Sequence, residues 1–222
     1  MIRQILRDLL ESEPAFWDDR LVSLPLYKNL IRNYLSIRSE ILELIEDPSQ
    51  LFDYPKTYLT SDHGTRRTPL YENTWKAIPF SLYSGEYIST TGVDSPSQHI
   101  LKVVRNVRSK CKALVRVISD LESDGNLRNG FVSKLLPGSY IRPHRGRTND
   151  FMRIHLGLEC YPLCFIQAGE ERRAWEDGKI IAFKDGGPHL HTVKHNGNKQ
   201  RIIISVDVSL EYLCGKVESL AI

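Results

Sequence analysis

From Asn126 to Leu213 the chain is a series of short apolar runs, and these runs decide the fold class. They are GFVSKLL (130–136), SYIRPH (139–144), MRIHLGLE (152–159), LCFIQA (163–168), KIIAF (179–183), HTV (191–193) and RIIISVDVSL (201–210). Turn signals such as Pro137-Gly138 and Asn196-Gly197 separate them. Many short strands with a turn every ~8–12 residues are typical of an antiparallel barrel or sandwich. We therefore predict a mainly β core within residues 75–213.

Helical patterns precede this core. Apolar residues recur at helical spacing through residues 1–47, where Pro48 ends the pattern, and again at about 96–121. Residues 47–74 are rich in Pro, Ser, Thr, Asp and Tyr, and we expect them to be irregular. WKAIPFSLYSGEY (75–87) alternates well enough to form strands. We predict a single domain over 1–222, in which a helical and irregular part, 1–74, supports the β core, 75–213.

Composition excludes several classes of protein. The chain has 222 residues, 41% of them hydrophobic and 26% charged, as in ordinary globular proteins. No apolar run approaches the ~20 residues of a membrane helix. The net charge of +3 gives no reason to predict nucleic-acid binding. We therefore expect neither a nucleic acid nor a membrane as a partner, and we make no prediction of oligomeric state.

The cysteines and the N-terminus favour a cytoplasmic location. MIRQILRDLLESEP (1–14) is charged throughout and lacks the apolar region of a signal peptide. The simplest interpretation of the cysteines is reduced and mostly buried thiols. Cys160 and Cys164 have no second Cys/His pair at zinc-site spacing, so a zinc site is not predicted. The four cysteines are Cys111, Cys160, Cys164 and Cys214.

Histidines gather in the β-rich part of the chain. Of the 7 histidines, those at 144, 155, 189, 191 and 195 lie in one short window. His144 ends one predicted strand, His191 follows another strand and a Gly-rich turn, and Arg201 opens the last strand. Two neutral imidazoles from separate strands suit Fe(II) while leaving coordination positions open. A buried Arg offers a planar fork for a carboxylate, here the far end of a dicarboxylate.

Taken together, these segments resemble the aspartyl/asparaginyl β-hydroxylases, a branch of the Fe(II)/2-oxoglutarate oxygenases. The resemblance covers residues 75–212 and is strongest from Ser133 onward, whereas the first 70 residues show no match. It implies a double-stranded β-helix core (jelly-roll, cupin-like) with N-terminal and mid-chain helices packed on one face. The segments that carry it are PGSYIRPHRGRTND (137–150), MRIHLGLE (152–159), WEDGKIIAF (175–183), the interval from His191 to Arg201, and IIISVDV (202–208).

The resemblance also implies a function and roles for individual residues. It implies a 2-oxoglutarate-dependent dioxygenase that uses Fe(II), 2-oxoglutarate and O2 to hydroxylate an unactivated C–H of an amino acid, peptidyl or related small substrate. His144 and His191 would be the iron ligands. The other implied residues hold 2-oxoglutarate: Arg153 and His155 near the metal-proximal carboxylate, and Arg201, assisted by Ser133, at the distal carboxylate.

Gly146 stands where most such oxygenases carry a carboxylate ligand, two residues after the first histidine. The β-hydroxylase family shares this gap, which implies water in that position, with Asp150 and Asp185 as alternatives. Halogenases also lack the carboxylate. A non-heme iron halogenase therefore stays open as an alternative function, and so does a non-enzymatic cupin-type metal-binding module.

Two further histidines have alternative interpretations. His189 follows the same Gly-rich turn as His191, but the ten-residue step to Arg201 favours His191 as the ligand. His189 would then lie at the rim of the site. His195 lies in a turn sequence, KHNGNK (194–199), and we expect it to be solvated.

The substrate is the least constrained part of the prediction. Family members that act on aspartyl residues carry an Arg at the position of Phe151, so an acidic substrate held by that contact is not expected here. Arg145 or Arg147 offers a replacement charge, although a solvated position is the simpler interpretation of both. We expect a substrate-side wall from Trp75 and the aromatic-rich stretch 54–87, which includes Arg66, Arg67, Tyr71 and Tyr83; ordinary loop packing is the alternative.

Overall fold

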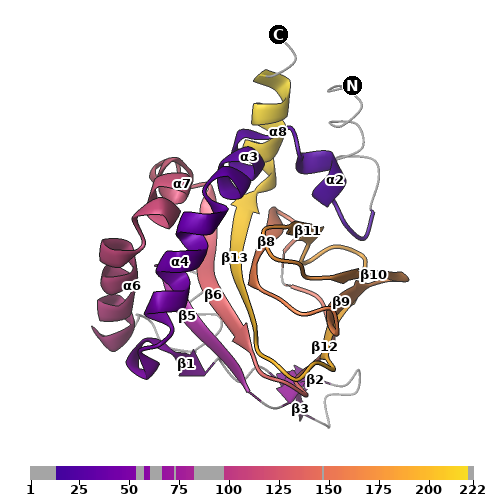
Figure 1. The fold of residues 1–222 in the computed structure, drawn as a ribbon. Helices are drawn as coiled ribbons and strands as arrows, with labels where there is room; N and C mark the ends of the chain where they lie inside the picture. The colour runs from indigo at the N-terminus through magenta and orange to yellow at the C-terminus, as the bar shows by residue number, and fades with distance from the viewer. Residues whose placement is uncertain are drawn as a thin grey trace.

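Eight antiparallel strands in two packed sheets form the core of the protein (Figure 1). The computed structural model describes residues 14–53, 58–60, 67–72, 74–82, 98–146 and 148–219. The core strands are, in chain order, β6 (Leu127–Leu135), β7 (Tyr140–His144), β8 (Phe151–Glu159), β9 (Cys164–Ala168), β10 (Glu171–Ala174), β11 (Ile180–Lys184), β12 (His191–His195) and β13 (Arg201–Ser209).

The eight strands pair in a nested order. The first pairs with the last, β6 with β13, and the second with the second-last, β7 with β12. Inside these, β8 pairs with β11 and β9 with β10. The large sheet therefore contains the order β6-β13-β8-β11, and the small sheet contains β10-β9-β12-β7. This nesting is that of a jelly roll, and it confirms the predicted double-stranded β-helix.

Shorter strands extend both sheets. β5 (Trp75–Leu82) and then β1 (Phe52–Asp53) continue the large sheet beyond β6, and β4 (Tyr71–Glu72) borders β7. β2 (Tyr58–Thr60) pairs separately with β3 (Arg67–Pro69). The prediction that residues 47–74 would be irregular was therefore wrong in part. Strands of two or three residues are too short to show a period; β1 and β4 pair with the longer strands β5 and β7, whereas β2 and β3 pair with each other.

Helices cover the outer face of the large sheet, as predicted. Figure 1 shows α4, α6 and α7 on the side of β6 and β13 that faces away from the small sheet. Apolar side chains of the helices and the large sheet form one buried cluster, which includes Ile41, Val107, Ile118 and Ile204. The helices are α2 (Asp18–Leu21), α3 (Pro25–Arg32), α4 (Tyr34–Leu44), the 3-10 helix η1 (Pro48–Gln50), α6 (Gln98–Lys110), α7 (Lys112–Ser123) and α8 (Leu210–Ser219).

The helical prediction for residues 1–47 is confirmed from α2 to α4, and residues 1–13 lie outside the described part. The single helix predicted at about 96–121 is a correction, because α6 and α7 are separate. Between them Cys111 has a non-helical ψ of 70°. The carboxylate of Glu40, on α4, accepts hydrogen bonds from the backbone N–H of Ala113 at 2.9 and 3.1 Å. A negative charge stabilises a helix N-terminus, so a side chain distant in sequence helps to begin a new helix here.

Strand β13 divides the two layers of the core. Ile202 and Ile204 join the cluster beneath the helices, whereas the alternate residues face the space between the sheets. Arg201, Ser205 and Asp207 are therefore buried, each at most 4% exposed. Because both faces of this strand are covered, polar side chains on its inner face lie in the interior and need partners there.

Two elements and one histidine depart from the sequence prediction. The pattern indicated neither β10, whose sequence ERRA is polar, nor α8 after the last strand. His195 was expected to be solvated but is 1% exposed, at the end of β12. Its backbone N–H donates to the Ser139 carbonyl at 3.0 Å, and its Nδ1 accepts from the Gly197 N–H at 3.3 Å. Strand pairing continues through this residue, and that pairing draws the imidazole inward.

No helix among the described residues combines the length and the apolar character needed to cross a membrane. The cysteines form no disulfide; Cys111 and Cys164 are buried, and Cys160 and Cys214 are half-buried.

Candidate metal centre

Three side chains that can bind a metal meet where the two sheets face each other. His144 ends β7 and His191 begins β12, and they are direct partners across this strand pair. Their ring centroids are 4.1 Å apart. Asp185 follows β11, and its Oδ1 lies 3.2 Å from His191 Nε2. One ligand atom from each of the three lies within 4.8 Å of the other two. Two imidazoles and one carboxylate are a donor set typical of non-heme Fe(II) sites.

The environment keeps His144 in a form that can bind a metal. Its Nδ1 is 2.8 Å from the Arg142 carbonyl, which fixes the proton on Nδ1 and leaves the Nε2 lone pair available. Burial, followed by the neighbouring His191, lowers the pKa of His144 to about 4. At neutral pH the ring is therefore uncharged. His191 Nδ1 is buried without a hydrogen-bond partner.

Asp185 occupies the space that Gly146 leaves open. A Cβ at residue 146 would lie 2.0 Å from Asp185 Oδ2. The Gly146 N–H also donates to the Asp185 carbonyl at 2.7 Å. Burial acts to raise the pKa of Asp185, but Arg153 and His191 outweigh it and hold that pKa below its usual range. The carboxylate is thus ionised beside the two imidazoles.

Arg153 links this carboxylate to the large sheet. Its NH1 donates to Asp185 Oδ1 at 2.6 Å. Its Nε and NH2 form a two-point contact with Asp207, at 2.7 and 2.8 Å. A guanidinium held at three points by two carboxylates has a fixed orientation. Arg153 therefore positions Asp185 as well as lining the cavity.

Arg201 lies in the same cavity as the histidines and is 2% exposed. Its guanidinium carbon lies 4.6 Å from the centre of the Trp175 ring, and its NH2 donates to Ser133 Oγ at 2.8 Å. No carboxylate among the described residues forms an ion pair with it, and its Nε has no hydrogen-bond partner. Burial lowers the pKa of Arg201. Within the described part of the chain, the positive charge of Arg201 thus lacks a counter-ion.

Ser133 and Trp75 complete this end of the cavity. Trp75 Nε1 donates to Ser133 Oγ at 2.9 Å, so the serine oxygen accepts from both Trp75 and Arg201. With its oxygen accepting twice, the hydroxyl proton remains to be donated to a bound group. Trp75 was predicted to face the substrate. It is buried at 8% exposure and stacks edge-on against Tyr71, beside the Ser133–Arg201 pair.

His155 lies in the same cavity, between the end that holds His144 and His191 and the end that holds Arg201. Trp175 Nε1 donates to His155 Nδ1 at 3.3 Å. Burial, followed by Arg153 and Arg201, lowers the pKa of His155 well below its usual value. Phe183 packs against both His155 and His191, with ring centroids 5.3 and 5.1 Å away. This side of the cavity is therefore aromatic and uncharged.

A family model described as aspartyl/asparaginyl β-hydroxylase matches residues 31–210, so the expectation that the first 70 residues show no match was wrong for residues 31–70. The chain belongs to this family. Mouse aspartyl/asparaginyl β-hydroxylase is 40% identical over 206 residues, which are 90% of this chain and 23% of that protein. Mouse aspartate β-hydroxylase domain-containing protein 2 is 35% identical over 140 residues, 60% of this chain and 38% of that protein. This β-hydroxylase family member thus spans well under half the length of these relatives.

Solved structures of low similarity include barrel proteins. A predicted oxalate decarboxylase from Thermotoga maritima has a TM-score of 0.38 at 12% identity, covering 71% of this chain and 94% of that one. A cupin 2 conserved barrel domain protein from Salinispora arenicola has a TM-score of 0.30 at 14% identity, covering 41% and 70%. The fold assignment rests on the strand pairing described above.

Several residues singled out in the sequence lie away from the cluster of His144, Asp185 and His191. Arg145 is exposed and donates to the Pro188 carbonyl. Asp150 is exposed and bonds Thr148, so of the two alternative carboxylates only Asp185 reaches the histidines. His189 packs over Gly169 and lines a depression on the outer side of the small sheet. Arg66, Arg147, Tyr83 and most of the stretch 54–87 outside β5 lie outside the described residues or have no described side chain.

The structure adds residues that the sequence analysis did not single out. Asp207 anchors Arg153, and the only signal for it was an acidic residue within an apolar strand. Arg128 lies on a bulge of β6, and its guanidinium carbon is 4.8 Å from the centre of the half-buried Phe151 ring. Phe151 therefore faces a cation from another strand, which no spacing rule along the chain could indicate.

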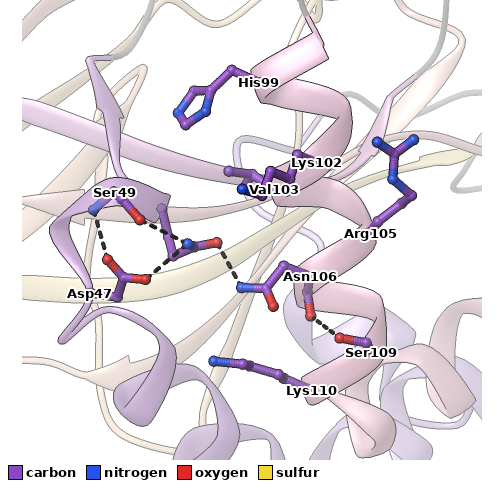
Figure 2. Close-up of a pocket in the computed structure, with 10 residues that line it drawn as sticks. Asp47, Ser49, His99, Lys102, Val103, Arg105, Asn106, Ser109 and Lys110 are labelled. Carbon is purple, nitrogen blue, oxygen red and sulfur yellow. Dashed lines mark hydrogen bonds between the residues drawn. The ribbon is translucent and has the colours of Figure 1, made fainter.

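A second cavity, of about 660 Å³, lies on the helical side of the large sheet between η1 and α6 (Figure 2). Its polar residues bond one another. Gln50 Nε2 donates to Asp47 Oδ2 at 3.0 Å, and Asn106 Nδ2 donates to Gln50 Oε1 at 2.8 Å. Within the part of the chain that the structure describes, a cluster of potential metal ligands occurs at His144, Asp185 and His191 and not here. Among the described residues, the cluster of side chains that could bind a metal therefore lies between the two sheets.

Proposed function

We propose that this β-hydroxylase family member is an Fe(II)- and 2-oxoglutarate-dependent oxygenase that hydroxylates an amino acid, a peptidyl side chain or a related small substrate. One observation carries the proposal. Arg201, which is buried and has no counter-ion among the described residues, shares a cavity with His144 and His191, and these two histidines form a cluster of potential metal ligands with Asp185. A ligand that suits this cavity binds a metal at one end and carries a negative charge at the other.

The burial of Arg201 supports a dicarboxylate co-substrate. An ion removed from water costs several kcal/mol unless a partner compensates it. A carboxylate beside Arg201 would supply that partner, and Ser133 would donate its hydroxyl proton to the same group. The distal carboxylate of 2-oxoglutarate meets these requirements, while its 2-oxo and adjacent carboxylate oxygens are good ligands for a metal.

The donor set supports iron. His144, His191 and Asp185 would hold Fe(II) through two neutral imidazoles and one ionised carboxylate, which leaves positions for 2-oxoglutarate and O2. When bound, the iron and its co-substrates supply the oxidation that converts a C–H bond to an alcohol. The chain supplies orientation: Arg153 fixes Asp185, Arg142 fixes the His144 tautomer, and the rings of Phe183 and Trp175 limit access of water.

The alternatives weighed from the sequence have less support. A halogenase needs space for a halide where the carboxylate is missing, and Asp185 fills the space beside Gly146. A metal-binding module without enzymatic activity has no need for a buried Arg201 aimed at an anion. For the substrate, Phe151 in place of an arginine favours a group that is less acidic than an aspartyl side chain.

The test combines a binding signal with turnover. Addition of 2-oxoglutarate to the anaerobic Fe(II)-loaded protein is expected to produce a weak visible charge-transfer band. Succinate release is then screened over amino acids and peptides, with His144→Ala as the blank. We expect His144→Ala and His191→Ala to abolish turnover, and His189→Ala to retain a measurable part. Absence of the band in wild type, or an active His191→Ala with an inactive His189→Ala, contradicts the assignment.

A further inference from the structure

An N-terminal segment, Ala15–Asp18, runs along the open edge of the sandwich. We call it the strap. The Trp17 N–H donates to the Ala182 carbonyl at 2.7 Å, on β11, which is the edge strand of the large sheet. Ala15, Phe16 and Trp17 are each at most 6% exposed. The strap thus covers an edge that would otherwise present free backbone groups.

The strap also reaches the edge of the small sheet. The guanidinium carbon of Arg173, on edge strand β10, lies 4.8 Å from the centre of the Phe16 ring. Its Nε is 3.8 Å from Asp18 Oδ2. The strap therefore joins the edges of both sheets, and Arg173 holds Phe16 from the outside.

Phe16 is one ring away from the metal ligands. It belongs to the apolar cluster between the sheets, whereas Trp17 belongs to the cluster beneath the helices. The rings of Phe16 and Phe183 meet edge to face, with centroids 6.3 Å apart at 70°. Phe183 in turn contacts His191 and His155 at 5.1 and 5.3 Å. Because interiors are close-packed, a gap at Phe16 lets Phe183 shift away from His191.

Trp17 acts on the same strand from the other side. It bonds Ala182, and the Lys184 ammonium lies 5.1 Å from its ring centre. Ala182 and Lys184 flank Phe183 in the sequence, and Asp185 directly follows Lys184. The strap thus holds the end of β11 from which both Phe183 and the metal-binding carboxylate project. The family model begins at residue 31, so the strap lies outside the part of the chain that this model matches.

We propose that the strap is a positioning element of the metal centre, and that Phe16, acting through Phe183, sets the placement of His191. The inference rests on the proposed metal site. Phe16 itself touches neither metal nor substrate, so its effect differs from that of a ligand. Its removal loosens the geometry of the site and leaves the ligands in place.

The test compares two matched Phe→Leu variants. Phe16→Leu removes the ring beside Phe183, and Phe80→Leu removes a ring that is also buried, 1% exposed against 6% for Phe16, from the cluster beneath the helices. Co(II) is titrated into each metal-free protein by calorimetry, and the visible Co(II) spectrum reports ligand geometry. We expect Phe16→Leu to weaken Co(II) binding about three- to tenfold and to change the spectrum. Phe80→Leu is expected to lower thermal stability only, with binding within twofold of wild type.

Phe16→Ala is expected to weaken binding further, and Phe16→Leu decides the question if the alanine variant does not fold. A Phe16→Leu protein with wild-type affinity and spectrum overturns the inference while leaving the proposed function intact. Equal losses in Phe16→Leu and Phe80→Leu also overturn it, because the effect is then general destabilisation. A wild-type protein that binds no Co(II) overturns both proposals.

Discussion

Gly146 and Asp185 share one space. The carboxylate of Asp185 lies where a side chain at 146 would begin, 2.0 Å from the position of a Cβ. Most oxygenases with this donor set take their carboxylate from the residue two after the first histidine. Here a carboxylate from the end of β11 reaches the same place, and the absence of a side chain at 146 makes room for it.

Substitution of Gly146 by alanine is expected to displace Asp185. The predicted result for Gly146→Ala is a loss of Co(II) or Mn(II) affinity of at least tenfold, measured by calorimetric titration. Gly215→Ala is the control, because no atom lies within 4 Å of its added Cβ. Equal affinity in Gly146→Ala and wild type would show that the carboxylate moves without cost.

Asp185→Asn tests the charge of the carboxylate rather than its place. The amide keeps the size of the side chain but loses the negative charge that faces His191 and Arg153. We expect a 10–100-fold weaker metal affinity, the range known for residues that support metal ligands, or a larger loss if Asp185 binds directly. Asp150→Asn, on an exposed loop, is expected to bind metal like wild type. An unchanged affinity in Asp185→Asn would remove this residue from the site.

Arg201→Met is expected to weaken the binding of 2-oxoglutarate without lowering the stability of the fold. Without the guanidinium, 2-oxoglutarate binding to the metal-loaded protein should fall by at least a hundredfold, while Co(II) affinity stays within twofold. Because the side chain is a buried charge without a counter-ion, the free energy of unfolding of the ligand-free variant should be unchanged or higher. Chemical denaturation measures this, with the exposed Arg172→Met as control. A marked loss of stability in Arg201→Met contradicts the idea of an uncompensated charge.

The pKa values of the buried histidines predict an acid-sensitive fold. The pKa of His144 is lowered from 6.5 to about 4, and that of His155 is lowered as well. The unfolded chain therefore takes up protons near pH 6.5, before the folded protein does. The free energy of unfolding of the metal-free protein should decline as pH falls below about 6.5, and His144 contributes about 1.4 kcal/mol per pH unit between about 6.5 and 4. A flatter decline is expected for His144→Gln, measured by denaturation at several pH values, and an identical decline would contradict the assignment.

Glu40→Ala is expected to destabilise the protein without affecting the metal site. The Glu40 carboxylate accepts hydrogen bonds from Ala113 and Leu114 at the start of α7. Loss of such a cap costs about 0.5–2 kcal/mol. Thermal denaturation and Co(II) titration together check this. The control is Glu43→Ala, at an exposed residue of α4, the helix that carries Glu40. A loss of Co(II) affinity in Glu40→Ala would mean that α7 supports the site.

Much of the fold could be predicted from sequence because its signals are local. The runs that became β6 to β9 and β11 to β13 showed their apolar character directly, and the Gly-containing turns marked their ends. β10 was not predicted because its sequence, ERRA, is polar, and this segment forms a strand by pairing with β9. The break between α6 and α7 at Cys111 was not predicted because part of its cause, the Glu40 side chain, lies on another helix.

Some residues of the candidate site could likewise be identified from sequence, and others could not. His144, His191 and Arg201 could be singled out because each is the first or last residue of a strand and has a recognisable spacing to the others. Asp185 could only be weighed against Asp150, since Asp185 directly follows one strand, Asp150 directly precedes another, and neither spacing decides between them. Asp207 and Phe16 could not be assigned a role, because each acts through a partner from a different strand or segment.

By itself, the sequence determined which segments form strands and which side chains with metal-binding or anion-binding chemistry lie at their ends, because periodicity and turn residues are properties of neighbouring positions. The tertiary structure alone decided which carboxylate lies beside the imidazoles, why Gly146 leaves room for it, and which rings pack against His191. Those outcomes depend on distances between segments that the nested strand pairing brings together, and no spacing along the chain encodes such distances.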